Sequence, residues 1–219
     1  MRKTLKSSAK DKLVEEKNTE ESLSAIFLLS KKVGRVAFSD AVKASSDFSV
    51  IPIDTTNDKL DKELISTLNS ILSEYLKRLT NTMSRSYGTR VNEVGRRIEE
   101  LLVNELNKQP LSVKRLSSTG YPDIEISHSG RIIYLEMKTS SVTKDSSFRY
   151  FYYSSGKKIK SDARHLLLDI TVRRESPDYW KIEKWALSDL SKLKLRLKCE
   201  FNASKKDLLD KEARLLSSQ

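Results

Sequence analysis

Two long segments of the chain carry hydrophobic residues at the three- and four-residue spacing of a helix. The longer one spans residues 58–83, and the other spans 91–107 and is stopped by Pro110. A shorter pattern of the same kind covers residues 18–30. Apolar stripes of this width usually pack in a core or form a subunit contact. We therefore predict that these segments are helices and that their apolar faces are covered.

Other segments show the patterns of strands. Residues 111–116 are expected to form a strand that leads into a hairpin over residues 120–140. Residues 165–172 are apolar enough for a central strand of a sheet. Residues 179–187 fit a strand or an edge piece. Residues 192–201 alternate almost perfectly between apolar and basic side chains. We expect the apolar face of this last segment to pack in the core, and its four cations to face water or a charged partner.

The hairpin carries an unusual set of charged residues. Asp123 comes at the start of its first strand, and Glu136 and Lys138 close the second strand. Side chains two residues apart on a strand share a face. Neighbouring carboxylates repel each other unless a cation lies between them or one holds a proton, and oxygen ligands suit Mg²⁺. Such a set can bind a divalent metal, polarise a phosphate and activate a water, which is the chemistry of phosphodiester hydrolysis.

The spacing of these residues matches a known motif. Pro122-Asp123, twelve further residues and then Glu136-Met137-Lys138 resemble the PD-(D/E)XK motif of nucleases, especially of type II restriction endonucleases. The resemblance implies an α/β or α+β fold, with a central mixed β-sheet flanked by helices and the metal site at a strand pair. It also implies Mg²⁺-dependent cleavage of DNA.

The resemblance further implies a role for each residue of the site. Asp123 and Glu136 would bind Mg²⁺ with the backbone carbonyl of Met137, and Lys138 would orient or activate water. The helix before the hairpin commonly contributes another acid in this family. Gly95-x-x-Ile98-Glu99-x-x-Leu102 is similar to that pattern, which makes Glu99 the candidate for supporting the metal shell.

The implied activity is hydrolysis of double-stranded DNA at a specific short, palindromic site, in the cytoplasm of a prokaryotic cell. A homodimer would cut the two strands of such a site. From the residue patterns and the resemblance together, we expect three parts in the chain. Residues 1–17 would be a mobile polar tail, residues 18–90 a helical region for packing, dimerisation or DNA contact, and residues 91–219 the nuclease core.

The charge of the chain favours a polyanionic partner. It has 41 basic and 30 acidic residues and a net charge of +11. Sixteen basic and eight acidic residues fall between Lys144 and Lys206, beyond the hairpin. The residues that we expect near DNA are Arg85, Arg90, Ser140, Arg149, Lys157 and Lys158.

Other interpretations remain open from the sequence. The hairpin charges could simply face water, in which case the chain would be a non-catalytic basic DNA-binding protein. A nuclease of the same kind could instead act on DNA structures of repair or recombination. His165 is better explained as a hydrogen-bonded core residue than as a catalytic base, because no second His or Cys lies near it at metal-ligand spacing. A single cysteine, Cys199, excludes an intramolecular disulfide, and without a long apolar run we expect a soluble intracellular protein with no membrane contact.

Overall fold

A computed structural model describes residues 21–26, 28–29, 32–82, 87–116, 120–141, 151–177 and 179–197. The described residues of Ala37–Lys194 form one compact unit, and those on either side of it belong to a second unit. The predicted division of the chain at residues 17 and 90 stays a prediction.

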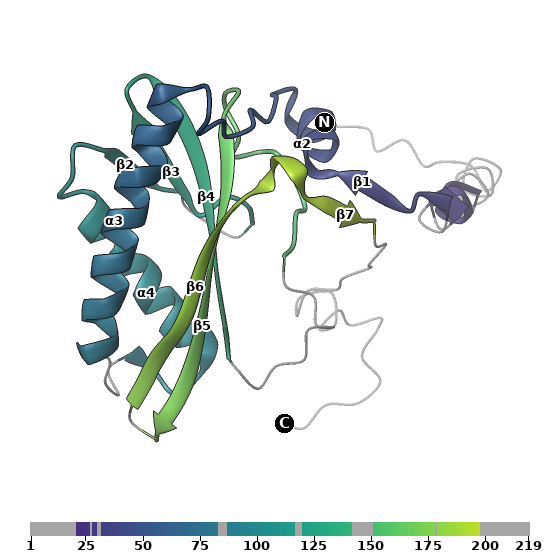
Figure 1. The fold of residues 1–219 in the computed structure, drawn as a ribbon. Coiled ribbons are helices and arrows are strands. Elements are labelled where there is room, and N and C mark those ends of the chain that lie inside the picture. The colour runs from purple at the N-terminus through teal and green to yellow at the C-terminus, as the bar shows by residue number, and fades with distance from the viewer. Residues whose placement is uncertain are drawn as a thin grey trace, which may run out of the picture. The chain divides into compact units, whose positions relative to one another are not determined.

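A five-stranded mixed sheet forms the centre of the larger unit (Figure 1). The strands lie in the order β2-β3-β4-β5-β6, in which β4 and β5 are parallel and the other neighbours are antiparallel. This confirms the predicted fold class, the predicted hairpin and the central position of the strand that begins near His165. The bounds are Ser112–Arg115 for β2, Ile124–His128 for β3, Arg131–Ser141 for β4, Arg164–Ser176 for β5 and Tyr179–Asp189 for β6.

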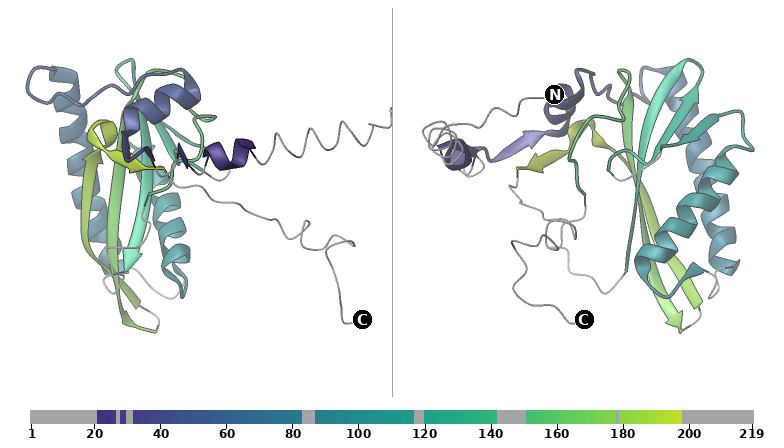
Figure 2. Two further views of the ribbon diagram at one scale, coloured as in Figure 1. Left: turned by 90° about the vertical axis from the view of Figure 1, so that its right-hand side faces the viewer. Right: turned by 180° about the vertical axis from the view of Figure 1, so that it is seen from behind.

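Helices cover both faces of this sheet (Figures 1 and 2). Helices α3 (Lys59–Thr82) and α4 (Val91–Leu106) lie on one face, close to their predicted positions. Helix α2 (Phe38–Ser46) lies on the opposite face. Its residues Phe38 and Val42 are fully buried. Among the described helices, none has the length and apolarity needed to cross a bilayer.

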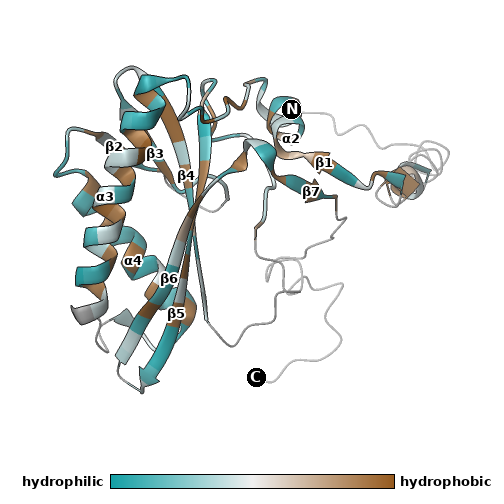
Figure 3. Ribbon diagram, viewed as in Figure 1, coloured by the Kyte–Doolittle hydropathy of each residue, from teal (hydrophilic) through white to brown (hydrophobic). Residues whose placement is uncertain are grey.

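The core between the sheet and α3 and α4 follows from two periodicities. The helices contribute apolar residues every three or four positions, of which Leu64, Ile98 and Leu102 are fully buried. Figure 3 shows α3 and α4 with hydrophobic bands between hydrophilic ones. Strand β4 contributes alternate residues such as Leu135 and Met137 to the same core. Because side chains on a strand alternate, Glu136 and Lys138 point to the other face of the sheet.

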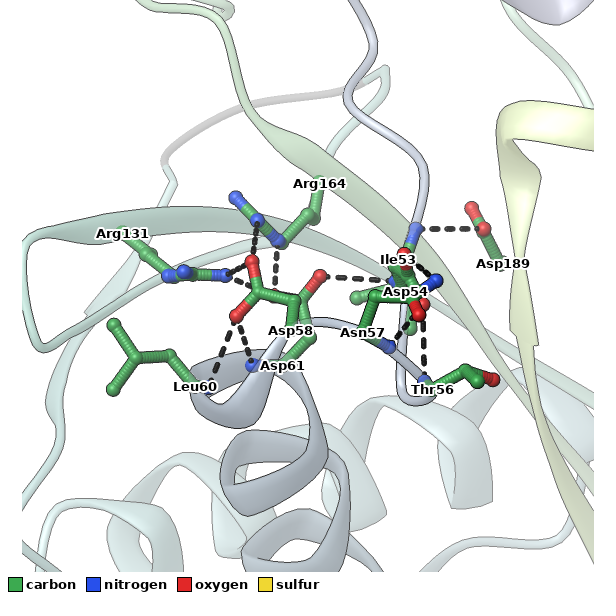
Figure 4. Close-up of polar contacts among 10 residues, drawn as sticks. All are labelled: Ile53, Asp54, Thr56, Asn57, Asp58, Leu60, Asp61, Arg131, Arg164 and Asp189. Atoms are coloured by element: carbon green, nitrogen blue, oxygen red, sulfur yellow. Dashed lines mark hydrogen bonds and ion pairs between the residues drawn. The ribbon is translucent and has the colours of Figure 1, made fainter.

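An ionic cluster joins the start of α3 to the first residues of β4 and β5 (Figure 4). Asp61 is fully buried, and its Oδ1 accepts hydrogen bonds from Arg131 Nη1 at 2.6 Å and from Arg164 Nε at 2.5 Å. Asp58 accepts from the backbone N–H groups of Leu60 and Asp61 and so caps the helix. The cluster fixes the end of α3 against the two parallel strands. Removing one partner from a buried ion pair is strongly destabilising.

The prediction of a core face for residues 192–201 is wrong in the described part. Residues Leu190–Lys192 form a 3₁₀ turn, and only Lys194–Arg196 form a strand, β7. This strand pairs with β1 (Arg35–Ala37) in a separate two-stranded sheet, and Leu197 is 42% exposed. A two-stranded sheet is too small to bury an apolar face by itself, so alternation did not lead to burial. Residues 198–201 lie outside the described residues.

Candidate active site

The β3–β4 turn fixes the register that brings the predicted acids together. Ser129 and Gly130 form a two-residue turn, and both have positive φ angles, 48° and 76°. The register pairs His128 with Arg131 at the turn and Ile124 with Leu135 at the other end. Since a one-residue slip would move every side chain to the opposite face, this turn decides which residues share a face. Asp123 therefore lies beside the part of β4 that carries the Glu-Met-Lys sequence.

Asp123 is held by backbone bonds on two sides and by its own side chain. Its N–H donates to the Leu135 carbonyl at 3.2 Å, and its carbonyl accepts from the Leu116 N–H at 2.8 Å. Its carboxylate Oδ2 accepts from the Met137 N–H at 2.8 Å. The N–H and C=O of one residue in a strand point to the same edge. The Met137 carbonyl thus points to the edge of β4 on which the Asp123 carboxylate lies.

Glu136 is the most perturbed acid of this region. Its side chain is only 4% exposed, Lys138 Nζ donates to its Oε1, and its Oε2 is buried without a hydrogen-bond partner in the described part of the chain. Burial, and then the charge of Asp123, raise the pKa of Glu136 to about 7, while Lys138 opposes this shift. A buried carboxyl oxygen without a partner, next to a second carboxylate, is an arrangement that a cation would stabilise.

Glu99 approaches the same site from α4. Arg115 Nε, at the end of β2, donates to Glu99 Oε1 at 2.7 Å. The pKa of Glu99 is raised by burial and then by the charge of Asp123, which shows that the two carboxylates are within electrostatic range. Gly95 allows this approach, because a Cβ atom there would lie 3.0 Å from the Cβ of Thr139 on β4. Asp123 is therefore within electrostatic range of both Glu99 and Glu136.

The donors fit a hard divalent ion bound mainly through oxygen. No group of three or more His, Cys, Asp or Glu side chains at metal-binding distance occurs in the described residues. The direct protein ligands would thus be two carboxylates and the Met137 carbonyl. Mg²⁺ usually keeps several waters and takes only one or two carboxylates. A short ligand set of this kind suits it.

The residues predicted to contact DNA differ in their exposure and in their distance along the fold from the acids. Ser140 lies on β4 on the same face as Glu136 and Lys138, and Lys157 is exposed. Arg90 is exposed at the start of α4, and no contact of the described residues joins it to the acids. Lys158 is only partly exposed and bonds to backbone carbonyls. Arg85 and Arg149 lie outside the described residues.

Two contacts next to Asp123 were missed by sequence reasoning. Lys158 Nζ donates to the carbonyls of Gly120 and Pro122, at 2.5 and 2.9 Å. The Tyr121 hydroxyl lies 2.6 Å from His165 Nδ1, and both side chains are buried. The second contact confirms that His165 is a hydrogen-bonded core residue. No local pattern signals either contact, because the partners are 36 to 44 residues apart.

Comparison with known proteins gives this geometry a context. Residues 31–212 match the family described as "Type II restriction enzyme MjaV family". The chain belongs to this family. The type II restriction enzyme MjaV of Methanocaldococcus jannaschii is 34% identical over 216 residues, which cover 88% of this chain and 93% of that protein. Membership of the MjaV family confirms the predicted enzyme class, a site-specific deoxyribonuclease, and argues against a non-catalytic DNA-binding protein.

Proposed function

We propose that this MjaV-family enzyme hydrolyses double-stranded DNA at a specific short, palindromic site with Mg²⁺, in an active site of the PD-(D/E)XK type. The observation that carries the proposal is the edge of β4, where the Asp123 carboxylate bonds to the Met137 N–H beside buried Glu136. The contact of Lys138 with Glu136 adds the third element of the motif. Further support comes from the pairing of β3 with β4, because Asp123 comes directly before β3 while Glu136 and Lys138 lie on β4.

Each residue would have a distinct task. An ion bound by Asp123, Glu136 and the Met137 carbonyl would neutralise both carboxylates and polarise the scissile phosphate. Lys138 would hold its proton at Nζ and orient the attacking water, since its ammonium group already lies at the Glu136 carboxylate. Glu99 would accept hydrogen bonds from water at the ion, in exchange for part of its present contact with Arg115.

Two copies of the chain would act together on a palindromic site, because two-fold symmetry presents the same site to both strands. Light scattering of the protein with a short cognate duplex tests this assembly. A particle with twice the 25.1 kDa protein mass is expected. A particle with one protein per duplex would contradict the dimer and would leave the chemistry of the site untouched.

A plasmid digest with and without Mg²⁺ tests the activity. The wild type should give discrete fragments only with the metal, and sequencing of the fragment ends would give the recognition site. Asp123→Asn and Glu136→Gln keep the shape of each side chain and should abolish cleavage. Glu125→Gln, on β3 two residues after Asp123, is the matched control and should cut like the wild type.

Three results would contradict the proposal. Wild-type cleavage that continues in EDTA would show that the reaction needs no divalent metal. Full activity of Asp123→Asn would show that Asp123 is not part of the active site. Cutting confined to branched DNA would replace the substrate by structures of repair or recombination.

A further inference from the structure

Lys158 makes contacts that differ from those of a surface lysine. Its Nζ donates to the Gly120 carbonyl at 2.5 Å and to the Pro122 carbonyl at 2.9 Å. These carbonyls flank Tyr121 and come directly before Asp123 in the chain. Hydrogen bonds from a charged donor are stronger than neutral ones. One ammonium group thus ties together the backbone turn from which the Asp123 side chain leaves.

The segment that carries Lys158 is itself fixed in place by α2. The ring of Phe38, fully buried at the start of α2, packs edge-on against Phe151 and Tyr153, with centroid distances of 5.9 and 5.5 Å. The Tyr153 hydroxyl lies 2.5 Å from Ser45 Oγ. Gly156 packs so closely on α2 that a Cβ atom there would lie 2.5 Å from the Ser46 Cβ. Helix α2 therefore supports residues 151–158.

The other side of the same turn is held as well. Tyr121 is 2% exposed, stacks on His165 and donates or accepts the hydrogen bond at His165 Nδ1. It also packs edge-on against Phe38. The backbone from Gly120 to Pro122 is thus enclosed between the aromatic cluster and the ammonium group of Lys158. With Lys158 in place, this backbone can move little, and the position of Asp123 is correspondingly fixed.

We propose that Lys158 is a positioning residue of the active site, which fixes the turn before Asp123 and so prepares the carboxylate for a divalent cation. This role replaces the phosphate contact expected from the sequence, and it rests on the proposed function. Groups that orient metal ligands without touching the metal typically change metal affinity or activity by about 10- to 100-fold when mutated. A phosphate contact would instead act on DNA affinity.

The test uses Mn²⁺ alone as the probe, with DNA-free protein, and measures bound ion by electron paramagnetic resonance. Lys158→Met removes the ammonium group and keeps the length of the side chain. We expect it to weaken Mn²⁺ binding by about tenfold or more. Lys157→Met removes the exposed neighbouring lysine and is the matched control, which should bind Mn²⁺ like the wild type. Lys158→Arg keeps a cationic donor and should recover most of the affinity.

DNA binding without metal separates positioning from phosphate contact. If Lys158 is a positioning residue and does not contact phosphate, DNA binding by Lys158→Met should depend on salt as that of the wild type does. Wild-type Mn²⁺ affinity in Lys158→Met, together with a salt slope reduced by about 1, would overturn the proposal. If Lys158→Met does not fold, Lys158→Arg decides, because recovery of DNA affinity without Mn²⁺ affinity would also overturn it.

A failure of the proposed function would look different. In that case Asp123→Asn would bind Mn²⁺ as the wild type does, since the ion would not be held at this site. Loss of Mn²⁺ in Asp123→Asn with no change in Lys158→Met would reject the positioning role alone.

Discussion

Because His165 is buried, we expect the free energy of unfolding to depend on pH, and the surroundings of His165 give the sign of this dependence. Its side chain is fully buried, and burial lowers its pKa from 6.5 to about 4 because the charged imidazolium is disfavoured there. The unfolded chain therefore takes up this proton at higher pH than the folded chain does. The contribution of neutral His165 to stability is fully present above pH 6.5 and is lost as the pH falls toward 4.

The size of this effect follows from the two pKa values. One pKa unit corresponds to about 1.36 kcal/mol, so the full loss near pH 4 is about 3 kcal/mol. At pH 5, where the unfolded state is mostly protonated and the folded state is not, the loss is about 2 kcal/mol. This is a large part of the total of about 5–15 kcal/mol that stabilises a typical domain.

For Glu136 we expect a contribution to the pH dependence of stability with the opposite sign, in the same pH range. Burial and the charge of Asp123 raise its pKa, so the folded chain takes up this proton at higher pH than the unfolded chain does. Ionised Glu136 therefore costs stability at neutral pH, and the cost disappears on acidification. The two effects partly cancel in the wild type, and single variants should expose each of them.

Urea unfolding at pH 7.5 and pH 5.0 in metal-free buffer, followed by tryptophan fluorescence, measures both effects. His165→Gln should lose less stability between these pH values than the wild type, by about 2 kcal/mol. Glu136→Gln should lose more than the wild type. His128→Gln, at the half-exposed end of β3, is the control for removing a histidine. The same pH dependence in His165→Gln and in the wild type would refute the reasoning.

Two further predictions concern packing. Asp61→Asn leaves two arginines next to a buried neutral group and should lower the free energy of unfolding by about 3–5 kcal/mol. Glu63→Gln on the exposed side of α3 should change it little, and equal stability of the two variants would contradict the role of the buried cluster. Gly156→Ala should cost about 1–3 kcal/mol and lower cleavage, because its Cβ would overlap Ser46. Gly34→Ala, with nothing within 4 Å, is its control, and a neutral Gly156→Ala would show that α2 moves freely.

Much of the fold could be predicted because its elements have strong local patterns. The apolar repeats of α3 and α4, and the run that begins at His165, are long enough to identify the element and its buried face. The turn at Ser129-Gly130 could be predicted from its residue types. The shared face of Glu136 and Lys138 followed from their two-residue spacing on a strand. Where the local signal and the final packing agree, sequence reasoning succeeds.

The features that the sequence did not predict have one physical cause, which is that burial and side-chain contacts depend on partners distant in the chain. Leu193, Leu195 and Leu197 alternate as core residues would, and yet β7 pairs with the short strand β1 in a two-stranded sheet. The bonds of Lys158 to carbonyls 36 and 38 residues away were likewise not predicted. Neither outcome can be derived from a window of the sequence.

The charges of the site explain how it could hold three acids without losing its structure. Glu99 is paired with Arg115, Glu136 with Lys138, and the turn before Asp123 with Lys158. With all groups ionised the formal charges of the six side chains cancel. Adding a divalent ion would leave the site with an excess of two positive charges, next to the position that a DNA phosphate must reach. Metal and phosphate would then favour each other's binding, and by linkage each would raise the affinity of the other by the same factor.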